Sequence, residues 1–322
     1  MQSVIVRQHG GAEVLRLESG QISRPGARQI QIRQRAIGLN MVDVYHRKGL
    51  YPTPLPFTPG TEAAGEVVAV GGDVTEFRNG DRVAYGNVFG AYTELRNIDA
   101  DQVVKVPAGM DLTVAGALMV KGLTAHFLLH RTHSLQAGES IVLHAAAGGV
   151  GMLVAQWARA KGAIVIGCVG SRAKARIAEE SGCNHVIIMD EQDFVDDVRR
   201  LTGGAGADVV YDSLGQDTFL RSLDCLRPEG LLVSFGNATG PVSIPNLGVL
   251  AQKGSLFVVR PTMGTYNATA AEMRGNAAAL FAAVEDGTLK VRVGQTFALE
   301  DIADAHRAIE QRRTIGSTVI LA

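Results

Sequence analysis

The chain has 322 residues, of which 46% are apolar and 20% are charged, and its formal net charge is −1. A chain of this length buries a large core and usually folds as two domains. The near-zero charge excludes bulk attraction to nucleic acid or to an anionic membrane. No apolar stretch approaches the roughly 20 residues that cross a bilayer, and the N-terminus lacks a secretory pattern, so we expect a cytoplasmic protein. The scattered Cys168, Cys183 and Cys225 are expected to be reduced thiols.

The first third of the sequence has the pattern of β-structure. Segments 3–8, 29–39 and 63–71 cluster or alternate β-forming residues, and turns rich in glycine and proline separate them. We therefore expect a small, antiparallel, barrel-like domain in this part of the chain.

From about Gly122 the pattern changes to a repeated unit of apolar strand, turn and amphipathic helix. The expected strands are 140–145, 163–169, 184–189, 208–213, 230–236 and 255–261, and the expected helices between them include 152–162, 174–182 and 194–204. Such alternation predicts a parallel sheet with helices on both faces. Segments 270–287 and 300–312 read as helices and 317–322 as a strand, and we expect this tail to return to the first domain.

The strongest functional signal lies at residues 140–161, where an apolar strand runs through a turn of alanines and glycines into a helix. Gly148 and Gly151 hold the second and third positions of the GxGxxG spacing, and Ala146 holds the first. Small residues let the backbone approach a pyrophosphate, which free N–H groups and the helix dipole stabilise. A tight packing turn needs the same glycines, but the repeated strand and helix units around this one favour a dinucleotide site.

The turn after the next strand indicates which dinucleotide binds. An NAD site usually presents an acidic side chain to the ribose 2′-hydroxyl at this point. The chain instead has Gly170, the hydroxyl of Ser171 and the cations Arg172 and Lys174. These groups suit the 2′-phosphate of NADPH, and each charge-assisted contact contributes about 1.5–3 kcal/mol. A solvated helix start is the alternative, and we favour NADPH.

Segments 38–52, 59–67, 121–129, 144–162, 209–215, 221–226 and 232–240 carry a resemblance to a known family, in one collinear order over essentially the whole chain. They closely resemble the zeta-crystallin-like quinone oxidoreductases, a zinc-free family of the medium-chain dehydrogenase/reductase superfamily. The resemblance implies a mixed α/β protein. A GroES-like β-barrel catalytic domain would comprise residues 1–122 and 265–322, and a Rossmann NADPH-binding domain with a doubly wound parallel sheet would comprise residues 123–264.

The resemblance also implies a set of NADPH contacts. Asn40 and Tyr45 would lie near the nicotinamide. The other implied contacts are Lys121 and Thr124 in KGLT, Gly148, Gly149 and Val150 at the pyrophosphate, Ser171 and Lys174 at the 2′-phosphate, Phe235, Gly236 and Asn237 in the cofactor cleft, and Arg260 and Arg312. Close relatives place a tyrosine beside the adenine-ribose phosphate, where this chain has Met189. That departure leaves more of the cofactor selectivity to Arg172 and Lys174.

The residues that zinc-dependent members of the superfamily use as ligands are replaced. Those members supply a cysteine after the second strand, a His-Glu pair in a GHE motif and often a lobe with four cysteines. This chain has Asn40 and the run Gly60-Thr61-Glu62. Because zinc prefers nitrogen or sulfur donors in a tetrahedral set, Asn40 and Thr61 remove the catalytic ligands. We therefore expect no metal and no zinc-assisted alcohol dehydrogenase reaction.

One other group of residues raises a metal hypothesis. His126, His130 and His133 follow i, i+4 and i+7 spacing, which would place them on one face of a helix. Their flanks contain no carboxylate or cysteine at ligand spacing, so we favour ordinary polar or interface histidines.

Without zinc, the acceptor must be electrophilic enough to take hydride with positioning as the main aid, and quinones meet that condition. Asn40, Tyr45 and Tyr51 would wall the acceptor pocket, with water or a tyrosine hydroxyl as proton source. Tyr51 fits a packing role equally well. One alternative is an enone or enoyl-thioester reductase. Another is a noncatalytic NADPH-binding protein that binds single-stranded RNA, but aromatics are only 5% and the charge is near zero, so nucleic acid is not an expected partner.

Residues 254–261 indicate how the chain assembles. As the last strand before the chain leaves the parallel sheet, this apolar segment is expected to lie at the sheet edge, where its unpaired backbone groups invite a partner. Pairing with its own copy across a two-fold axis would give a homodimer, the commonest kind of oligomer. The alternative is that the loop 237–246 of the same chain covers this edge.

Overall fold

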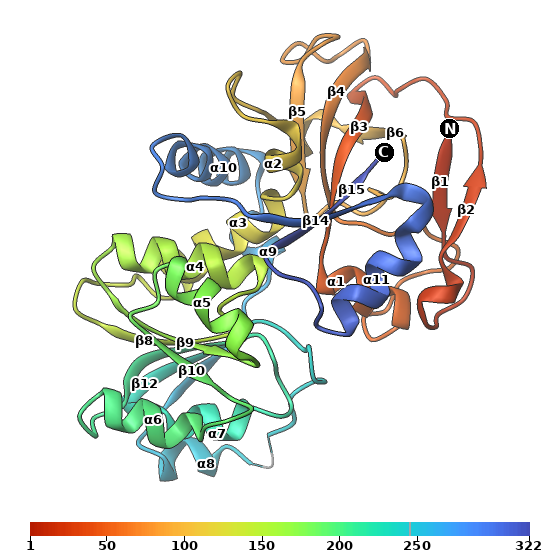
Figure 1. Ribbon diagram of the computed structural model, residues 1–322. Helices are drawn as coiled ribbons and strands as arrows, with labels where there is room; N and C mark the ends of the chain where they lie inside the picture. The colour runs from red at the N-terminus through yellow and green to blue at the C-terminus, as the bar shows by residue number, and fades with distance from the viewer. Residues whose placement is uncertain (245) are drawn as a thin grey trace. The chain divides into compact units, whose positions relative to one another are not determined.

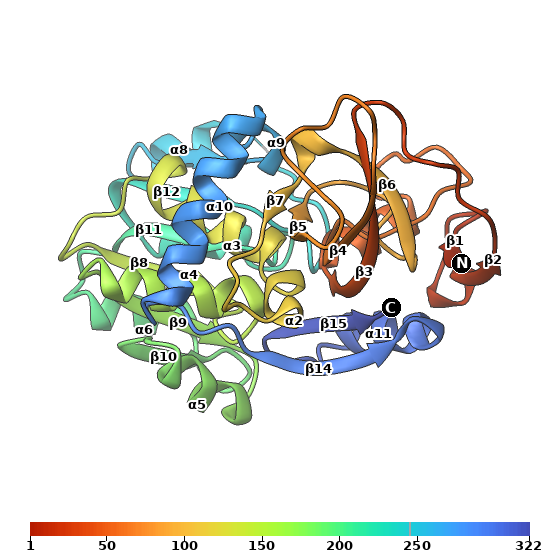
Figure 2. The same ribbon diagram turned by 90° about the horizontal axis from the view of Figure 1, so that it is seen from above.

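The computed structural model of the protein describes residues 1–244 and 246–322. The chain divides into two compact units, each described separately below. The first unit comprises Met1–Leu123, Asn267–Glu285 and Val291–Ala322, and the second comprises Thr124–Tyr266 and Asp286–Lys290. Figures 1 and 2 show their helices and strands from two directions. Within the described part of the chain, no helix combines the length and the apolar character that spanning a membrane requires.

The first unit is built mainly on antiparallel strands. Its strands are β1 (Gln2–Ile5), β2 (Arg16–Ser19), β3 (Gln29–Leu39), β4 (Glu62–Val70), β5 (Arg82–Gly86), β6 (Leu95–Asp99), β7 (Val104–Lys105), β14 (Val293–Ala298) and β15 (Ser317–Leu321). The larger sheet has the order β14-β15-β3-β4-β5-β7, with β6 on β3, and β1 pairs with β2 separately. Neighbouring strands run antiparallel, whereas β14 and β15 run parallel. The predicted antiparallel architecture of the N-terminal third is confirmed.

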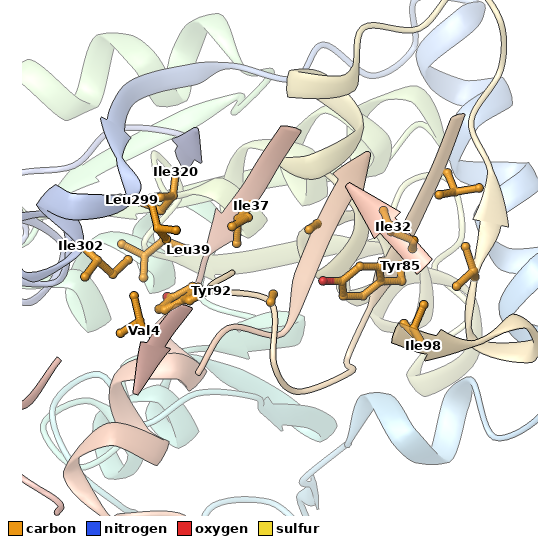
Figure 3. Packing of buried hydrophobic residues seen from close by; sticks show 14 of the residues in the cluster. Val4, Ile32, Ile37, Leu39, Tyr85, Tyr92, Ile98, Leu299, Ile302 and Ile320 are labelled. Carbon is orange, nitrogen blue, oxygen red and sulfur yellow. The ribbon is translucent and has the colours of Figure 1, made fainter. Parts of the chain in front are cut away.

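The core of this unit is a cluster of buried apolar side chains, part of which Figure 3 shows as sticks. The alternating pattern of β3 buries Ile30 and Ile32, whereas the following residue, Arg33, points to the other side and is exposed. Residues from distant parts of the sequence meet in this cluster, and Figure 3 labels Val4, Ile32, Ile37, Leu39, Tyr85, Tyr92, Ile98, Leu299, Ile302 and Ile320. Burying an aliphatic or aromatic side chain of this size contributes about 1.5–3 kcal/mol.

Helices and 3₁₀ turns complete the first unit. They are α1 (Met41–Lys48), α2 (Leu112–Gly116), α10 (Ala270–Glu285) and α11 (Ile302–Glu310), with 3₁₀ turns at Ala12–Val14, Ala100–Gln102 and Leu299–Asp301. α10, α11 and β15 confirm the helices and the strand predicted for the C-terminal segment. β15 pairs with β3, which joins this segment to the sheet of the N-terminal segment.

The second unit holds a parallel sheet. Its strands are β8 (Ser140–His144), β9 (Ile164–Val169), β10 (His185–Ile188), β11 (Ala207–Asp212), β12 (Leu226–Ser234) and β13 (Phe257–Val259), in the order β10-β9-β8-β11-β12-β13. Each predicted strand is present, and the pairings are parallel. The order is that of a doubly wound nucleotide-binding sheet, whose direction of winding switches between β8 and β11. The predicted α/β class is confirmed.

Helices lie on both faces of this sheet (Figure 1). They are α4 (Gly149–Ala160), α5 (Arg172–Glu180), α6 (Phe194–Leu201), α7 (Phe219–Asp224), α8 (Gly248–Gln252) and α9 (Met263–Tyr266), while α3 (Met119–Phe127) begins in the first unit and continues into the second. On one face, Phe194 of α6 and Phe219 of α7 pack against Val142 and Ile166 of the strands. Cys168, Cys183 and Cys225 are buried free thiols, and burial raises the pKa of Cys183 and Cys225 to about 12.

Candidate functional site

The glycine turn lies between β8 and α4, at the carboxyl edge of the parallel sheet. Gly148 is the N-cap of α4 and donates its N–H to the carbonyl of Ala145 at 2.8 Å, and no side chain caps the helix. A Cβ on Gly151 would lie 2.3 Å from the Ala145 oxygen, so a larger residue would push the turn away from the helix. The N–H groups of the first helical turn therefore face a region without a side-chain cap, which suits an anion.

The turn after β9 presents the residues predicted to bind a 2′-phosphate. Gly170 precedes Ser171, the N-cap of α5, whose side chain makes no capping hydrogen bond. Arg172 begins α5 and Lys174 follows two residues later. The structure adds a partner that the sequence did not reveal, because the exposed Arg172 side chain forms an ion pair with Glu191 at 2.8 Å. Any phosphate at this turn would share Arg172 with a carboxylate.

Met189 follows β10, the strand that pairs with β9. Its half-buried side chain packs against the core of the parallel sheet. A thioether in this position offers no hydroxyl for a phosphate. Where close relatives have a tyrosine, Met189 therefore contributes to core packing.

Asp212 organises the turn after β11, next to β8 at the point where the winding switches. Its buried carboxylate accepts hydrogen bonds from the backbone N–H groups of Leu214 and Gly215 at 2.8 and 3.0 Å. The hydroxyls of Thr218 and Ser222 also donate to it, at 2.8 and 2.9 Å. These bonds compensate for burying the charge and fix the turn.

The loop after β12 holds Phe235, Gly236 and Asn237. A Cβ on Gly236 would lie 2.3 Å from the Ser213 oxygen, so glycine lets this loop lie against the turn after β11. Arg260, which directly follows β13, donates to the carbonyl oxygens of Ser234 and Gly236 at 3.1 and 2.9 Å. The structure thus gives Arg260 a role in holding the loop. Because the strands are parallel, these turns share one sheet edge with the glycine turn.

In the first unit, Asn40 and Lys121 meet at a carboxylate that sequence reasoning missed. Asn40 is the N-cap of α1, and Lys121 lies in the first turn of α3. Asn40 Nδ2 and Lys121 Nζ donate to Glu62 Oε1 at 2.8 and 2.6 Å, and the N–H of Val120 donates to Glu62 Oε2 at 2.6 Å. The sequence offered one signal for this carboxylate: Glu62 directly follows Thr61, a position that holds a zinc ligand in the zinc-dependent members of the superfamily.

A second buried carboxylate, Asp43, lies beside this cluster. It accepts hydrogen bonds from the N–H of Asn40 at 2.9 Å, from the hydroxyl of Thr61 at 3.0 Å and from the hydroxyl of Tyr92 at 3.1 Å. Burial raises the pKa of Asp43 to about 7. Asn40 and Thr61 occupy the positions that hold zinc ligands in zinc-dependent members of the superfamily. Here both side chains donate hydrogen bonds to carboxylates, Asn40 to Glu62 and Thr61 to Asp43.

A buried chain of hydrogen bonds connects Asp43 to the surface. Arg47 can only donate, so His306 Nδ1 accepts from it at 3.1 Å and His306 Nε2 carries the proton. His306 Nε2 then donates to the Tyr92 oxygen at 3.0 Å, which leaves the Tyr92 hydroxyl to donate to Asp43. Burial, and then the Arg47 charge, lowers the pKa of His306 to about 3. Arg47 also pairs with Glu310 at 2.9 Å.

Tyr45 and Tyr51 belong to an aromatic cluster in the first unit. The Tyr45 and Tyr51 rings meet edge to face with centroids 5.4 Å apart, and His46 contacts Tyr51 in the same way. The ring of Phe89, which is 43% exposed, lies edge-on to His46 at 4.3 Å. These contacts give Tyr51 a packing role, and its role in an acceptor pocket stays a prediction.

The two remaining predicted contacts are Thr124 and Arg312. Thr124 is on α3, three residues after Lys121. Arg312 lies in the turn between α11 and β15, and its φ of 56° is in the left-handed region.

The histidine motif does not form one helical face. α3 gives way to a π-helical turn at Leu128–Thr132, which shifts His133 out of the α-helical spacing. His126 and His130 stack with centroids 4.7 Å apart, and both contact Trp157, whereas His133 pairs with Glu139 at 3.0 Å. Burial and the neighbouring His130 and Arg131 lower the pKa of His126 to about 4. The described residues contain no group of three or more His, Cys, Asp or Glu side chains arranged to hold a metal ion.

Two family models match the chain. The model described as "Alcohol dehydrogenase GroES-like domain" matches residues 26–108, and the one described as "Zinc-binding dehydrogenase" matches residues 149–281. The first match covers most strands of the antiparallel sheet. The second begins at the first residue of α4, in the glycine turn.

Individual relatives match over nearly the full length. A quinone oxidoreductase of Pseudomonas aeruginosa is 49% identical, with 97% of each chain covered. A 2-haloacrylate reductase of a Burkholderia species is 42% identical, with 100% of this chain and 99% of that protein covered. The crystal structure of Escherichia coli quinone oxidoreductase complexed with NADPH superposes with a TM-score of 0.98 at 43% identity, covering 100% of both chains. The chain therefore belongs to the zinc-free quinone oxidoreductase family of the medium-chain dehydrogenase/reductase superfamily.

Proposed function

We propose that this protein is an NADPH-dependent quinone reductase that transfers hydride from NADPH to a quinone without a metal ion. The observation that carries the proposal is the glycine turn between β8 and α4, in a chain of this family. A Cβ on Gly151 would lie 2.3 Å from the Ala145 oxygen, and no side chain caps α4. The residues present therefore fit a dinucleotide pyrophosphate.

The second unit would hold most of the cofactor. Gly148, Gly149 and Val150 would bind the pyrophosphate through backbone N–H groups. Gly170, Ser171, Arg172 and Lys174 would surround the 2′-phosphate, and Phe235, Gly236, Asn237, Arg260 and Thr124 would complete the contacts from this unit. Arg312, which belongs to the first unit, would add a further contact. A hydroxyl and two cations support a preference for NADPH, because each cation can form a charge-assisted hydrogen bond to the phosphate.

The first unit would position the acceptor. NADPH, when bound, supplies a hydride. Asn40 and Tyr45 would orient its nicotinamide, Lys121 would add a cationic contact, and Tyr51 would wall the acceptor pocket. Water or a tyrosine hydroxyl would supply the proton. We accordingly assign residues 1–122 and 265–322 to the catalytic domain and residues 123–264 to the cofactor domain.

A second candidate function is the reduction of an electron-poor alkene. The 2-haloacrylate reductase that is 42% identical to this chain supports it. Both reactions deliver hydride to an electrophilic acceptor, but an enone, haloacrylate or enoyl thioester also needs a proton at the α-carbon. The nature of the acceptor therefore separates the two functions.

One assay tests both functions. NADPH oxidation would be followed with benzoquinones, naphthoquinones, 2-haloacrylate, simple enones and crotonyl thioesters, with electron spin resonance to detect one-electron products. Turnover of quinones supports the proposal. Turnover of the alkenes alone would replace it with the second function, and oxidation with none of these acceptors would refute both.

The proposal includes a homodimer and a cytoplasmic location. β13 ends the strand order of the parallel sheet, and its Phe257 side chain is 60% exposed. Pairing of β13 with its own copy would satisfy the edge and cover this ring. The buried free thiols fit a reducing compartment, which supports the cytoplasm.

A further inference from the structure

Glu62 is a charged side chain at the start of β4 that is completely buried. Its carboxylate accepts hydrogen bonds from Asn40 Nδ2 at 2.8 Å, Lys121 Nζ at 2.6 Å and the N–H of Val120 at 2.6 Å. These donors come from the N-cap of α1 and from the first turn of α3. One carboxylate thus links two residues that the proposed function places at the cofactor.

The neighbouring backbone leaves room for this carboxylate. Gly38 is the partner of Glu62 in the β3–β4 ladder, and a Cβ on Gly38 would lie 2.1 Å from Glu62 Oε1. The same Cβ would lie 2.5 Å from the carbonyl oxygen of Gly116. A side chain at position 38 would therefore displace the carboxylate from its donors.

Stability alone is a poor explanation for this arrangement. A buried ion pair often contributes no more to folding than apolar residues of the same volume, because both charges lose their hydration. The pair of Glu62 and Lys121 is nearly dry, with side-chain exposures of 0% and 6%. What the pair does supply is orientation, since a carboxylate only accepts hydrogen bonds and therefore turns the amide nitrogen of Asn40 toward itself.

We propose that Glu62 is a positioning residue for hydride transfer, acting through Asn40 and Lys121. The inference rests on the proposed function. Glu62 fixes the amide of Asn40 and uses one of the N–H donors of Lys121, and the ammonium retains further donors for a ligand. Glu62 itself neither touches the reacting atoms nor gives up a proton. Its loss should therefore disorder the nicotinamide and weaken cofactor binding.

The main test compares Glu62→Gln with Glu66→Gln. Glu66 lies on the same strand, but its half-exposed side chain pairs with Arg35 at 3.1 Å. Each variant would be assayed for the NADPH dissociation constant, kcat, the KM for a quinone, and the primary isotope effect with NADPH deuterated at the transferred position. For Glu62→Gln we expect NADPH binding to weaken by about tenfold or more, as for loss of a charged hydrogen bond.

The isotope effect is the measurement that would stay unchanged if Glu62 had only a structural role. Misplacement of the nicotinamide slows the hydride step itself, so kcat should fall and the isotope effect should rise in Glu62→Gln. The KM for the quinone should change less than kcat. Glu66→Gln should match the wild type in all of these measurements.

A double variant separates positioning from folding. Glu62→Gln leaves the Lys121 ammonium buried without its counter-charge, which destabilises the fold. Adding Lys121→Met removes that charge and should restore thermal stability. Because Lys121→Met also removes a proposed cofactor contact, the double variant is compared with Lys121→Met alone. If Glu62 only stabilised the fold, these two variants would share one NADPH dissociation constant and one isotope effect, and that result would overturn the inference. We expect stability to recover in the double variant, while its NADPH binding and kcat fall below those of Lys121→Met because Asn40 is no longer oriented.

Failure of the inference is distinguishable from failure of the proposed function. Wild-type protein that does not bind or oxidise NADPH would refute the proposed function. Wild-type protein that oxidises NADPH, together with a folded Glu62→Gln variant of unchanged dissociation constant, kcat and isotope effect, would refute the positioning role alone.

Discussion

Arg172 and Glu191 form a two-point ion pair at the carboxyl edge of the parallel sheet. Arg172 Nε and Nη2 donate to the two Glu191 carboxylate oxygens at 2.8 and 2.9 Å. The hydrogen bonds from Arg172 lower the pKa of Glu191, which keeps the carboxylate charged. A 2′-phosphate bound at this turn would therefore compete with Glu191 for the guanidinium.

The first prediction follows from this competition. Glu191→Gln removes a negative charge beside the proposed phosphate position and releases Arg172, so NADPH should bind more tightly. Because the pair is exposed, the gain should be modest, about two- to fivefold at low salt and less at high salt. Fluorescence titration with NADPH and NADH would measure it, with no gain expected for NADH. Glu180→Gln is the control, since Glu180 pairs with Arg176 on α5 at 3.0 Å. Weaker NADPH binding in Glu191→Gln would instead show that Glu191 orients Arg172 for the phosphate.

The second prediction concerns cofactor choice. The double variant Arg172→Ala, Lys174→Ala removes both cations from the turn after β9. NADPH binding should weaken by about tenfold or more, whereas NADH binding should change little, because only NADPH carries the 2′-phosphate. Arg176→Ala, one turn further along α5, is the matched control and should leave the preference unchanged. An equal loss for both cofactors, or no loss for either, would remove these residues from the phosphate site.

The third prediction tests the glycine turn. In Gly151→Ala the new Cβ would lie 2.3 Å from the Ala145 oxygen, so the turn must move away from the helix. The free energy of unfolding should fall by about 1–3 kcal/mol, and NADPH binding should be lost or greatly weakened. Gly275→Ala, within α10, is the control because a Cβ there meets nothing within 4 Å. That variant should be more stable by about 0.5–1 kcal/mol, since alanine favours a helix interior. Urea unfolding and NADPH titration of both variants would decide the point.

The fourth prediction concerns metal removal. We expect full activity after exhaustive chelation, because Asn40 donates its amide to Glu62 and Thr61 donates its hydroxyl to Asp43. Neither side chain resembles the nitrogen and sulfur donors that zinc prefers. Elemental analysis before and after chelation, with the quinone assay on the same samples, would check this expectation. One tightly held zinc per chain, with activity lost on its removal, would contradict the metal-free reaction.

The local pattern of the sequence was enough to predict most of the parallel sheet. Strands such as 140–145 and 163–169 are continuous apolar runs because both faces of the sheet are covered, and the structure has β8 and β9 there. The turn at Gly148 could be predicted equally well, since its function depends on residue size over a few consecutive positions. In both cases the determining contacts are close in sequence.

The polar clusters could not be predicted in this way. Arg47 and His306 lie 259 residues apart and meet only when α11 packs near α1, so no local spacing signals their hydrogen bond. The pairing of Arg172 with Glu191 similarly depends on the neighbouring positions of β9 and β10. The histidine spacing failed for a different reason, because a π-helical turn interrupts the α-helix on which the predicted common face depended.

The last prediction concerns the edge of the parallel sheet. β13 pairs with β12 and ends the described strand order, which confirms the expected edge position of this segment. Its side chains differ in direction: Val258 packs partly buried against the core, whereas Phe257 is 60% exposed. A charge at position 258 would disturb the core, so Phe257→Lys is the sharper probe of an interface.

We expect the wild type to be a dimer in light scattering at micromolar concentration, and Phe257→Lys to shift it toward monomer with an unchanged melting temperature at low concentration. Lysine is the residue that natural edge strands use against pairing. Leu220→Lys is the control, because Leu220 is also exposed, at 43%, but lies on α7 and not on β13, and this variant should remain dimeric. A monomeric wild-type protein with full activity would refute the dimer. A Phe257→Lys variant that remains dimeric would place the interface on another surface.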